Sequence, residues 1–481
     1  MAVLLVGLAS VLVVNTLRIG PSKQELAPAS RLNIDVPAAA QRLGEAIRFR
    51  TVSKPPGVPA DPQTFRDLHQ FLIRSFPLVH KHLTREVVSE YSLLYRWEGS
   101  DLSRRPILLS AHMDVVPEQG RWTRPPFSGA VEGGFIWGRG TLDDKVAVLA
   151  ILEAAEHLLS KGFRPHRTIY FAFGHDEEID GRNGAARIAA RLKERNVRLT
   201  AIYDEGWFVS HGLVPGIKRP VAFIGTAEKG YLSLELVART SGGHSSVPSE
   251  RSAIRVLLDA EERLEAHPFE AALKPPITEA LDHLAPEFSF LPRMILANRW
   301  LFGQMLLSRL EKVPETNALV RTTTAVTIMN AGTKDNILPA TARLVVNFRI
   351  VPGQTVAGVT DRVRRIVANP RISIRQYGAA SDPSPIADTG SEAYQQLVRS
   401  VRQEFPKAAI APALVVSASD SRHYTQLADQ IFRFRPMRLS RSDLGRIHGI
   451  DERIAIANYG EHIRFWVRLM RNMASVGERR E

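Results

Sequence analysis

Between residues 91 and 203, continuous apolar runs typical of buried strands alternate with the spacing of an amphipathic helix. Short continuous apolar runs, such as 107–109 and 168–173, predict buried strands. Between them, one face of a helix predicted over 145–159 is apolar, through Val148, Leu149, Leu152, Ala155 and Leu159. This alternation of strands and helices predicts an α/β domain whose mostly parallel sheet is covered by helices on both faces.

The pattern changes near Gly225 and changes back near Ser391. Before the first change we expect helices at 36–49, 63–76 and 183–195, and strands at 84–88, 91–97, 135–140 and 200–203. Between the changes we expect strands at 232–238, 322–329, 342–349 and 371–376, and helices at 252–264, 288–310 and 355–368. After them we expect helices at 391–404, 421–428 and 457–473, and strands at 413–417 and 431–435. One α/β domain, 37–224 and 381–481, is therefore predicted to be interrupted by an α+β two-layer sandwich at 225–380.

The N-terminus is apolar from Ala2 to Val14, which is shorter than the roughly 20 residues of a comfortable membrane span. No basic residue precedes the apolar part, and no clean cleavage site follows it. We predict a signal-anchor or signal sequence over 1–20, with a buried first helix as the alternative, and a polar linker over 21–36. This places the protein on a membrane anchor or in a secreted or periplasmic location.

Composition narrows the chemistry and the partners. The 481 residues include no cysteine, so any metal must be held by His, Asp and Glu. The formal net charge is +13, but the basic residues are dispersed and no nucleic-acid module is recognisable. We therefore expect a dispersed basic surface and no nucleic-acid partner. If the positive charge binds a partner, an anionic membrane surface contacted through the N-terminus is the more plausible one.

Acidic residues and a histidine follow the predicted strands at their carboxyl ends. His112 and Asp114 close the first run, and they share one face because they are two residues apart. The pairs Asp143-Asp144, Glu177-Glu178 and Asp204-Glu205 follow later strands, and His448 lies in a late loop. The carboxyl ends of parallel strands meet in one crevice.

Carboxylates crowded in this way are costly without a cation, and two histidines among them suit a pair of divalent ions. Zn²⁺ is the leading candidate, and Mn²⁺ or Co²⁺ would also suit these ligands. Each acidic pair alone could instead be a helix cap, as Asp143 and Asp144 could be for the helix that follows them.

The motifs SAHMDVVP, WGRGTLDDK, GHDEE, YDEG, SGGHSSVP, VNFRIVPG and RIHGIDE occur in this order. In this they resemble the aminoacylase/carboxypeptidase clan of di-zinc peptidases. Within the clan, the stretches TNALVRTTT, NILPA and NFRIVPGQTV are most similar to the branch of the N-fatty-acyl-amino-acid synthase/hydrolase and carboxypeptidase S. The resemblance implies a zinc-peptidase catalytic domain interrupted by a lid that is also the dimerisation domain in dimeric relatives.

The resemblance also implies a role for each site residue. His112 and Asp204 would bind one zinc ion, and Glu178 and His448 would bind the other. Asp143 would bridge the two ions, and its peptide bond to Asp144 would be cis. Asp114 would orient His112 without touching a metal, and Glu177 would act as general base and then general acid. In the lid, His244 would polarise the scissile carbonyl, and Arg349, with Asn336, would hold the substrate carboxylate; Asn336 could equally be a turn-former. The loop at Asp420 matches a family loop, but a helix cap at Asp420 explains it equally well.

The implied reaction is cleavage, or formation, of the amide bond of an N-acyl amino acid with a free carboxylate. A carboxypeptidase releasing C-terminal amino acids from peptides is the alternative, and a non-catalytic binding protein on the same fold is a third reading. The apolar segment 288–310 could line an acyl tunnel or form part of the core of the lid.

Overall fold

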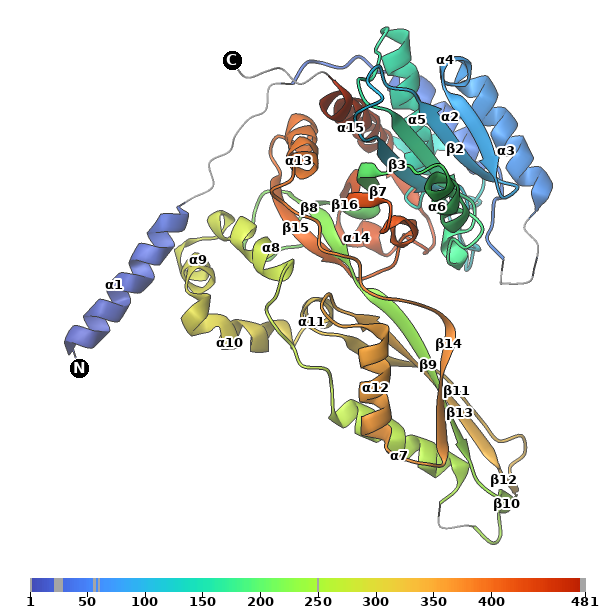
Figure 1. The fold of residues 1–481 in the computed structure, drawn as a ribbon, viewed down its shortest axis with the longest axis vertical. Coiled ribbons are helices and arrows are strands. Elements are labelled where there is room, and N and C mark those ends of the chain that lie inside the picture. The colour runs from blue at the N-terminus through green and yellow to red at the C-terminus, as the bar shows by residue number, and fades with distance from the viewer. Residues whose placement is uncertain (1, 21–28, 55–57, 59–60, 249–250, 476–481) are drawn as a thin grey trace.

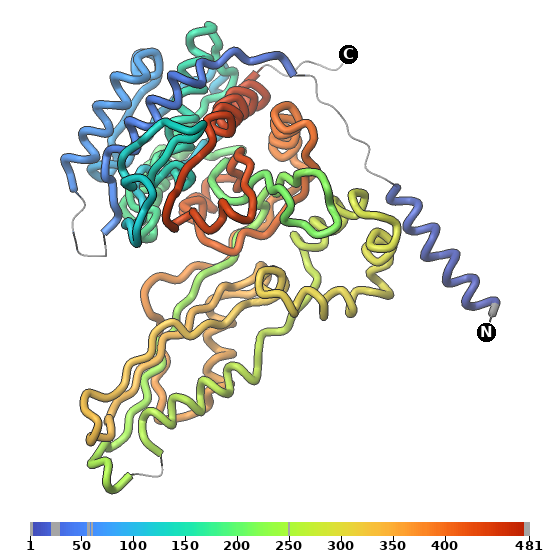
Figure 2. The backbone as a smooth tube through the Cα atoms, turned by 180° about the vertical axis from the view of Figure 1, so that it is seen from behind, coloured from blue at the N-terminus to red at the C-terminus, as the bar shows by residue number. Residues whose placement is uncertain are grey.

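The protein has a rounded α/β part and an elongated lid that projects from it (Figure 1). The computed structural model describes residues 2–20, 29–54, 58, 61–248 and 251–475. Seen from behind, the lid leaves the α/β part and returns to it at one place (Figure 2).

An eight-stranded sheet forms the centre of the α/β part, in the order β1-β2-β6-β3-β7-β16-β8-β15. Its central pairs, β6 with β3, β3 with β7 and β7 with β16, are parallel, as are β8 and β15, whereas β1, β2 and β6 pair antiparallel. The strands are β1 (Thr84–Val88), β2 (Ser92–Trp97), β3 (Ile107–His112), β6 (Ile169–Gly174), β7 (Leu199–Ser210), β8 (Val221–Glu228), β15 (Ala409–Val415) and β16 (Ala428–Leu439). The predicted mostly parallel sheet is confirmed.

Helices cover both faces of this sheet because successive strand residues point to opposite sides. Leu109 and Phe171 face a core shared with α2 (Val36–Ile47), α3 (Pro62–Ser75), α4 (Pro77–His82), α5 (Lys145–Ser160), α13 (Glu392–Glu404) and α15 (Ile456–Ala474). Their neighbours Leu108 and Tyr170 face a second core with α6 (Ala185–Glu194). The helix and strand positions predicted for this part agree with the structure to within a few residues, apart from the differences given below.

A small antiparallel sheet ties the late loop to the centre of the chain. It contains β4 (Val131–Glu132), β5 (Phe135–Trp137) and β17 (Arg453–Ala455), with β5 in the middle. Because β17 pairs with β5, the loop that carries His448 lies next to the loop that carries Asp143. The short α14 (Arg441–Leu444) precedes that loop.

The lid is a two-layer sandwich. Its four antiparallel strands lie in the order β11-β13-β9-β14, and α7 (Ala253–Ala266) and α12 (Val356–Val367) pack on them. The strands are β9 (Gly230–Arg239), β11 (Thr323–Ala331), β13 (Thr341–Ile350) and β14 (Ile372–Ser381), with the small pair β10 (Gly243–His244) and β12 (Ile337–Leu338) at the tip (Figure 1). The change from the large sheet to this one falls just after Glu228, where β8 ends and β9 begins.

Three elements differ from the sequence predictions. The helix expected at 288–310 is two helices, α9 (Phe290–Ala297) and α10 (Arg299–Leu310), because Asn298 between them has a non-helical backbone. The helix expected at 421–428 is a five-residue 3₁₀ turn, η3 (Asp420–Tyr424), whose Ser421 N–H donates to Asp204 instead of extending a helix. The strand expected at 200–203 continues through Ser210 as β7.

Four further elements lie outside the sandwich layers. They are the helix α8 (Ile277–Leu284), the 3₁₀ turn η2 (Ala285–Glu287), the helix α11 (Pro314–Val320) and the 3₁₀ turn η1 (Glu177–Ile179), which follows β6. Helix α8 packs on β15, so part of the inserted segment rests on the large sheet.

The N-terminal segment forms α1 (Ala2–Ile19), which lies against α9. Within the described part of the chain, neither α1 nor any other helix meets the length and apolarity needed to cross a membrane. The signal-anchor or signal sequence over 1–20 stays a prediction. Residues 21–28 of the predicted linker lie outside the described residues.

Candidate metal centre

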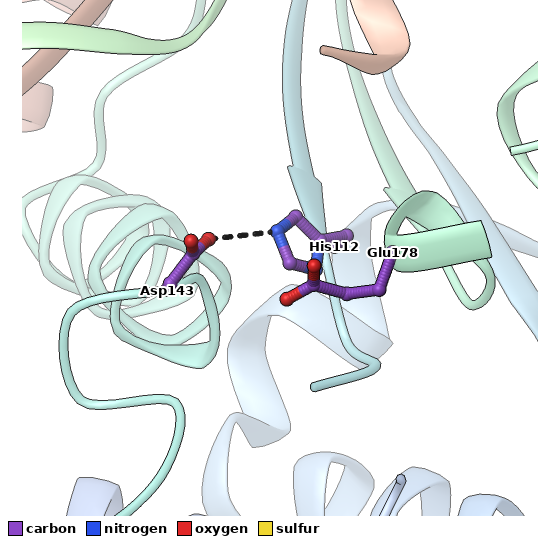
Figure 3. Close-up of side chains that lie close together, drawn as sticks. All are labelled: His112, Asp143 and Glu178. Atoms are coloured by element: carbon purple, nitrogen blue, oxygen red, sulfur yellow. Dashed lines mark hydrogen bonds and ion pairs between the residues drawn. The ribbon is translucent and has the colours of Figure 1, made fainter. Parts of the chain in front are cut away.

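His112 stands at the carboxyl end of β3 with its ring held from two sides. Its Nδ1 lies 3.0 Å from the Asp114 main-chain oxygen, and its Nε2 lies 3.1 Å from Asp143 Oδ1 (Figure 3). The side chain is 1% exposed. Burial alone would lower the pKa of His112, but the carboxylates of Asp114 and Asp143 outweigh it and raise that pKa well above the usual range. The site therefore favours a positive charge at this ring.

Asp143 is presented by a loop that Glu452 organises. The Glu452 carboxylate accepts hydrogen bonds from the N–H groups of Gly140 at 2.9 Å and Leu142 at 2.7 Å, and it pairs with Arg139. The peptide bond between Asp143 and Asp144 is cis, as the resemblance implies. The loop geometry is thus fixed by a buried acid from the RIHGIDE motif.

His448 approaches Asp143 from the opposite side. Its Nε2 lies 3.1 Å from Asp143 Oδ2 and 3.4 Å from Glu178 Oε2. Hydrogen bonds to Asp143 and Glu178 raise the pKa of His448 to about 10. Asp143 thus holds one imidazole on each of its two oxygens, which is the arrangement of a carboxylate placed between two cation positions.

Asp114 lies next to His112 and holds the main chain at Glu177 and Glu178, just after β6. Its carboxylate accepts from Ser53 Oγ at 2.5 Å, from Glu177 N at 3.2 Å and from Glu178 N at 3.1 Å. It is completely buried and takes no part in either group of potential metal ligands.

Glu177 lies next to Glu178 and belongs to neither group of side chains that could hold a metal ion. It opens η1, directly after β6, and its backbone is fixed by Asp114. Burial, with further contributions from Asp420 and Glu178, raises the pKa of Glu177 well above the usual range, although His112 opposes this. A partly buried carboxyl with a raised pKa keeps a proton more readily than an exposed one, which suits a group that must both accept and donate a proton.

Two groups of ligand atoms could each hold a cation. One contains His112, Asp143 and Glu178, and the other contains His112, Asp144 and Glu205; within each group the atoms lie within 4.8 Å of one another. Glu178 Oε1 and both carboxylate oxygens of Asp144 are buried without a hydrogen-bond partner. Buried unpaired carboxylate oxygens are costly, and a divalent ion would satisfy them. The donor set, nitrogen and carboxylate oxygen without sulfur, fits zinc.

The structure does not bring Asp204 into these groups. Asp204 Oδ2 instead accepts a hydrogen bond from Ser421 N at 2.8 Å, and the neighbouring Glu205 faces the centre, 3.6 Å from His112 Nε2. Arg435, on β16, was also missed; its guanidinium lies 2.7 Å from Asp143 Oδ1 and pairs with Glu205. The signal for it was an arginine pair two residues apart, Arg433 and Arg435, in a strand that is otherwise buried.

The lid residues lie away from this centre within one chain. His244, on β10, is exposed and bonds Ser246 Oγ, and the backbone of Asn336 bonds that of Ser245; both are at the tip of the lid, at the far end from β3 (Figure 1). Arg349 lies at the base of the lid over the ring of Tyr231, 4.6 Å from its centroid. Asp420, in η3, does not cap a helix, since its carboxylate is buried without a partner.

Comparison with known proteins matches residues 108–472 to the model of peptidase family M20/M25/M40. A probable carboxypeptidase S-like 2 of Dictyostelium discoideum is 41% identical over 482 residues, which cover 98% of this chain and 92% of that protein. An N-fatty-acyl-amino acid synthase/hydrolase of Danio rerio is 44% identical over 437 residues, covering 89% and 84%.

Solved structures share the fold at lower identity. An M20 family metallo-carboxypeptidase of Sulfolobus solfataricus has a TM-score of 0.65 at 18% identity and covers 90% of this chain and 98% of that one. Human carnosine dipeptidase 1 has a TM-score of 0.65 at 15% identity and covers 92% and 97%.

Proposed function

Because the chain belongs to peptidase family M20/M25/M40 and is a metal-dependent hydrolase, we propose that it cleaves N-acyl amino acids at their amide bond. The product pair would be a carboxylate and a free amino acid, and the same site would catalyse the reverse condensation. The observation that carries the proposal is Asp143, which holds His112 on one oxygen and His448 on the other within a cluster of unpaired buried carboxylates.

We propose two Zn²⁺ ions as the cofactors, with Mn²⁺ or Co²⁺ as substitutes. His112, Asp143, Glu178 and His448 would hold them as the sequence predicts, and Glu205 would take the place of Asp204 because it faces the centre. The ions would supply Lewis acidity for the amide carbonyl and acidify a bound water.

Glu177 would carry the proton. It lies next to the ligand Glu178, has no place in either ligand group, and is held by the Asp114 contact to its backbone. In this role it takes a proton from the attacking water and delivers it to the leaving amide nitrogen, so that one carboxyl serves as base and acid.

The substrate class rests on the relatives and on Arg349. An enzyme named for N-fatty-acyl amino acids aligns over 89% of this chain, and a planar guanidinium suits the free carboxylate of such a substrate. Burial lowers the pKa of Arg349, and Glu228 and Tyr231 oppose this effect. An anionic substrate group would relieve the cost of the buried cation.

A matched pair of substrates tests the proposal. The Zn²⁺-loaded protein is expected to release phenylalanine from N-oleoyl-phenylalanine faster than leucine from N-carbobenzoxy-Gly-Leu, with Glu177→Gln as the inactive control. If only the blocked dipeptide is cleaved, the chain is a carboxypeptidase. That second candidate is favoured by the carboxypeptidase S-like relative, which aligns over 98% of this chain.

The position of His244 supports a homodimer as part of the proposal. At the tip of the lid it is remote from the centre of its own chain, so its contact with substrate would require a second copy (Figure 1). Mixing Glu177→Gln with His244→Ala, each inactive alone, should restore activity through mixed dimers. If each variant is a monomer and the mixture remains inactive, the role of His244 is wrong.

A further inference from the structure

Helix α1 is docked on the lid through a buried polar contact. Asn298, between α9 and α10, is fully buried, and its Nδ2 donates to Leu12 O at 3.2 Å. Its Oδ1 accepts from Asn15 Nδ2 at 2.8 Å, and the neighbouring Thr16 is 1% exposed. Both views show α1 beside α9 (Figures 1 and 2), and α9 in turn contacts α10. The three helices therefore form one unit, which we call the α1–α9–α10 face.

This face leaves large apolar side chains in contact with solvent. At the start of α1, four consecutive side chains are between 62% and 85% exposed: Val3, Leu4, Leu5 and Val6. The lid helices add Phe290, Leu291, Trp300, Leu301 and Met305, which are 43% to 65% exposed. No residue of α10 is fully buried, although Leu307 and Leu310 pack partly buried against the cluster that contains Ile277 and Val320. Apolar exposure on this scale marks a binding surface.

The charge of the face selects among binding partners. Neither α1 nor the stretch 290–310 contains an acidic residue, and both contain arginines. Arg299 pairs with Asp282 of α8 at 2.7 Å, and Arg293 donates to the main-chain oxygens of Pro286 and Phe288. The cations that remain to meet a partner are Arg18 and Arg309, in the last turns of α1 and α10. A second copy docked through the same face would bring these cations together, which is unfavourable. A surface of anionic phospholipid offers both apolar chains and negative head groups, and an exposed tryptophan such as Trp300 is favoured where the two meet.

We propose that the α1–α9–α10 face docks the protein on anionic phospholipid bilayers. The apolar side chains of α1 and α10 enter the outer part of the acyl layer, and Arg18 and Arg309 contact the head groups. The inference goes beyond the proposed hydrolase activity and does not depend on it, because no residue of the metal centre belongs to this face.

Flotation of the full-length protein with vesicles tests this. The protein is expected to float with phosphatidylcholine vesicles that contain phosphatidylglycerol and to float much less with phosphatidylcholine alone. Leu4→Asp and Trp300→Asp should each weaken binding about 50-fold or more, because they place a charge in the apolar layer. Arg309→Glu should weaken it about ten-fold, and raised salt should do the same.

A matched control separates docking from general effects of a new charge. Leu102 is 65% exposed on the α/β part, so Leu102→Asp adds the same charge away from the face and should bind like the unmodified chain. Equal binding by Leu4→Asp and Leu102→Asp overturns the proposal, as does failure of the unmodified chain to float. A dimer that Leu4→Asp dissociates, without flotation of the unmodified chain, would assign the face to a second copy and also overturn it.

Discussion

Replacing Glu205 by Gln should remove a metal ligand, whereas replacing Asp204 by Asn should not. The two carboxylates are neighbours in sequence, yet only the ligand atom of Glu205 lies within 4.8 Å of those of His112 and Asp144. Gln keeps the size of Glu and removes its charge, so the comparison isolates the anionic ligand.

The Glu205 substitution should weaken metal binding, whereas the Asp204 substitution should lower the free energy of unfolding. Losing a contact that merely supports a metal ligand weakens metal binding by roughly 10- to 100-fold. Losing a ligand itself should therefore cost more than about 100-fold, or about 2.7 kcal/mol of metal-binding free energy. Asp204→Asn keeps an oxygen for the Ser421 N–H, so it should cost only about 1–2 kcal/mol of unfolding free energy, from the weaker hydrogen bond.

Metal content after dialysis, together with titration calorimetry of the metal-free protein, measures the metal affinity. Chemical denaturation in the presence of a chelator measures the free energy of unfolding. In the metal-free state, Glu205→Gln also removes one of the two carboxylates that pair with Arg435, while Asp143 remains 2.7 Å from that guanidinium. We therefore expect a moderate loss of stability there, separate from the loss of metal.

The reverse result would refute this reasoning. If Asp204→Asn loses an ion and Glu205→Gln retains both with unchanged affinity, then Asp204 is the ligand, as the sequence resemblance implies. The contact between Asp204 and Ser421 would then belong only to the metal-free state.

Three further predictions concern other parts of the chain. Glu177→Gln should lower kcat about 10²- to 10⁴-fold while metal content, measured in parallel, stays the same; loss of metal would contradict its place outside the ligand groups. Arg42 pairs with the buried Glu153 at 2.6 and 2.8 Å. Arg42→Ala should therefore cost about 3–5 kcal/mol of unfolding free energy, because it leaves a buried charge unpaired, whereas the double variant Arg42→Met, Glu153→Leu should cost much less. Equal losses in denaturant titrations would show that the buried charge is not the cause. Burial lowers the pKa of His69 to about 4, so between pH 6.5 and 4 the unfolded chain binds a proton that the folded chain does not, and stability falls by about 2–3 kcal/mol as pH drops through that window. His69→Gln should flatten this part of the stability profile, and an unchanged slope between pH 7 and 4.5 would refute the assignment.

Much of the fold could be predicted because the spacing of apolar residues within one strand or helix is a local property of the sequence. The runs at Ile107 and Thr168 and the helix over 145–160 are specified by apolar spacing alone, and strand ends in a parallel sheet share one edge. This is why His112 and Glu178, at the ends of β3 and β6 of that sheet, could be expected together. Asp143 follows β5 of the small antiparallel sheet and His448 lies in a loop before β17, so only the resemblance of the motifs predicted that they join the same site.

The choice between Asp204 and Glu205 could not be made from spacing. Adjacent residues in a strand face opposite sides, so one irregularity reverses which acid enters the crevice. The pairing of β7 with β16 shifts register between Asp204 and Trp207, and nothing in the local sequence marks that shift. Arg435 was missed for a related reason, since its partners come from other segments.

The lid helices could not be placed by composition alone. An apolar stretch such as 288–310 reads equally as core or as exposed surface, because the hydrophobic pattern does not say what covers it. Asn298, where the stretch breaks, bonds Leu12 and Asn15, nearly 300 residues earlier in the chain, and no local pattern reveals these contacts.

The position of β16 between β7 and β8 sets the order in which the enzyme can be completed during synthesis. Residues 199–228 emerge from the ribosome roughly 200 residues before β16, a delay of roughly 10 to 40 s at ordinary elongation rates. Until then β7 and β8 lack their shared neighbour, and His448, the second imidazole on Asp143, emerges later still. The metal centre therefore cannot be completed before His448 has been synthesised, long after His112 and Asp143.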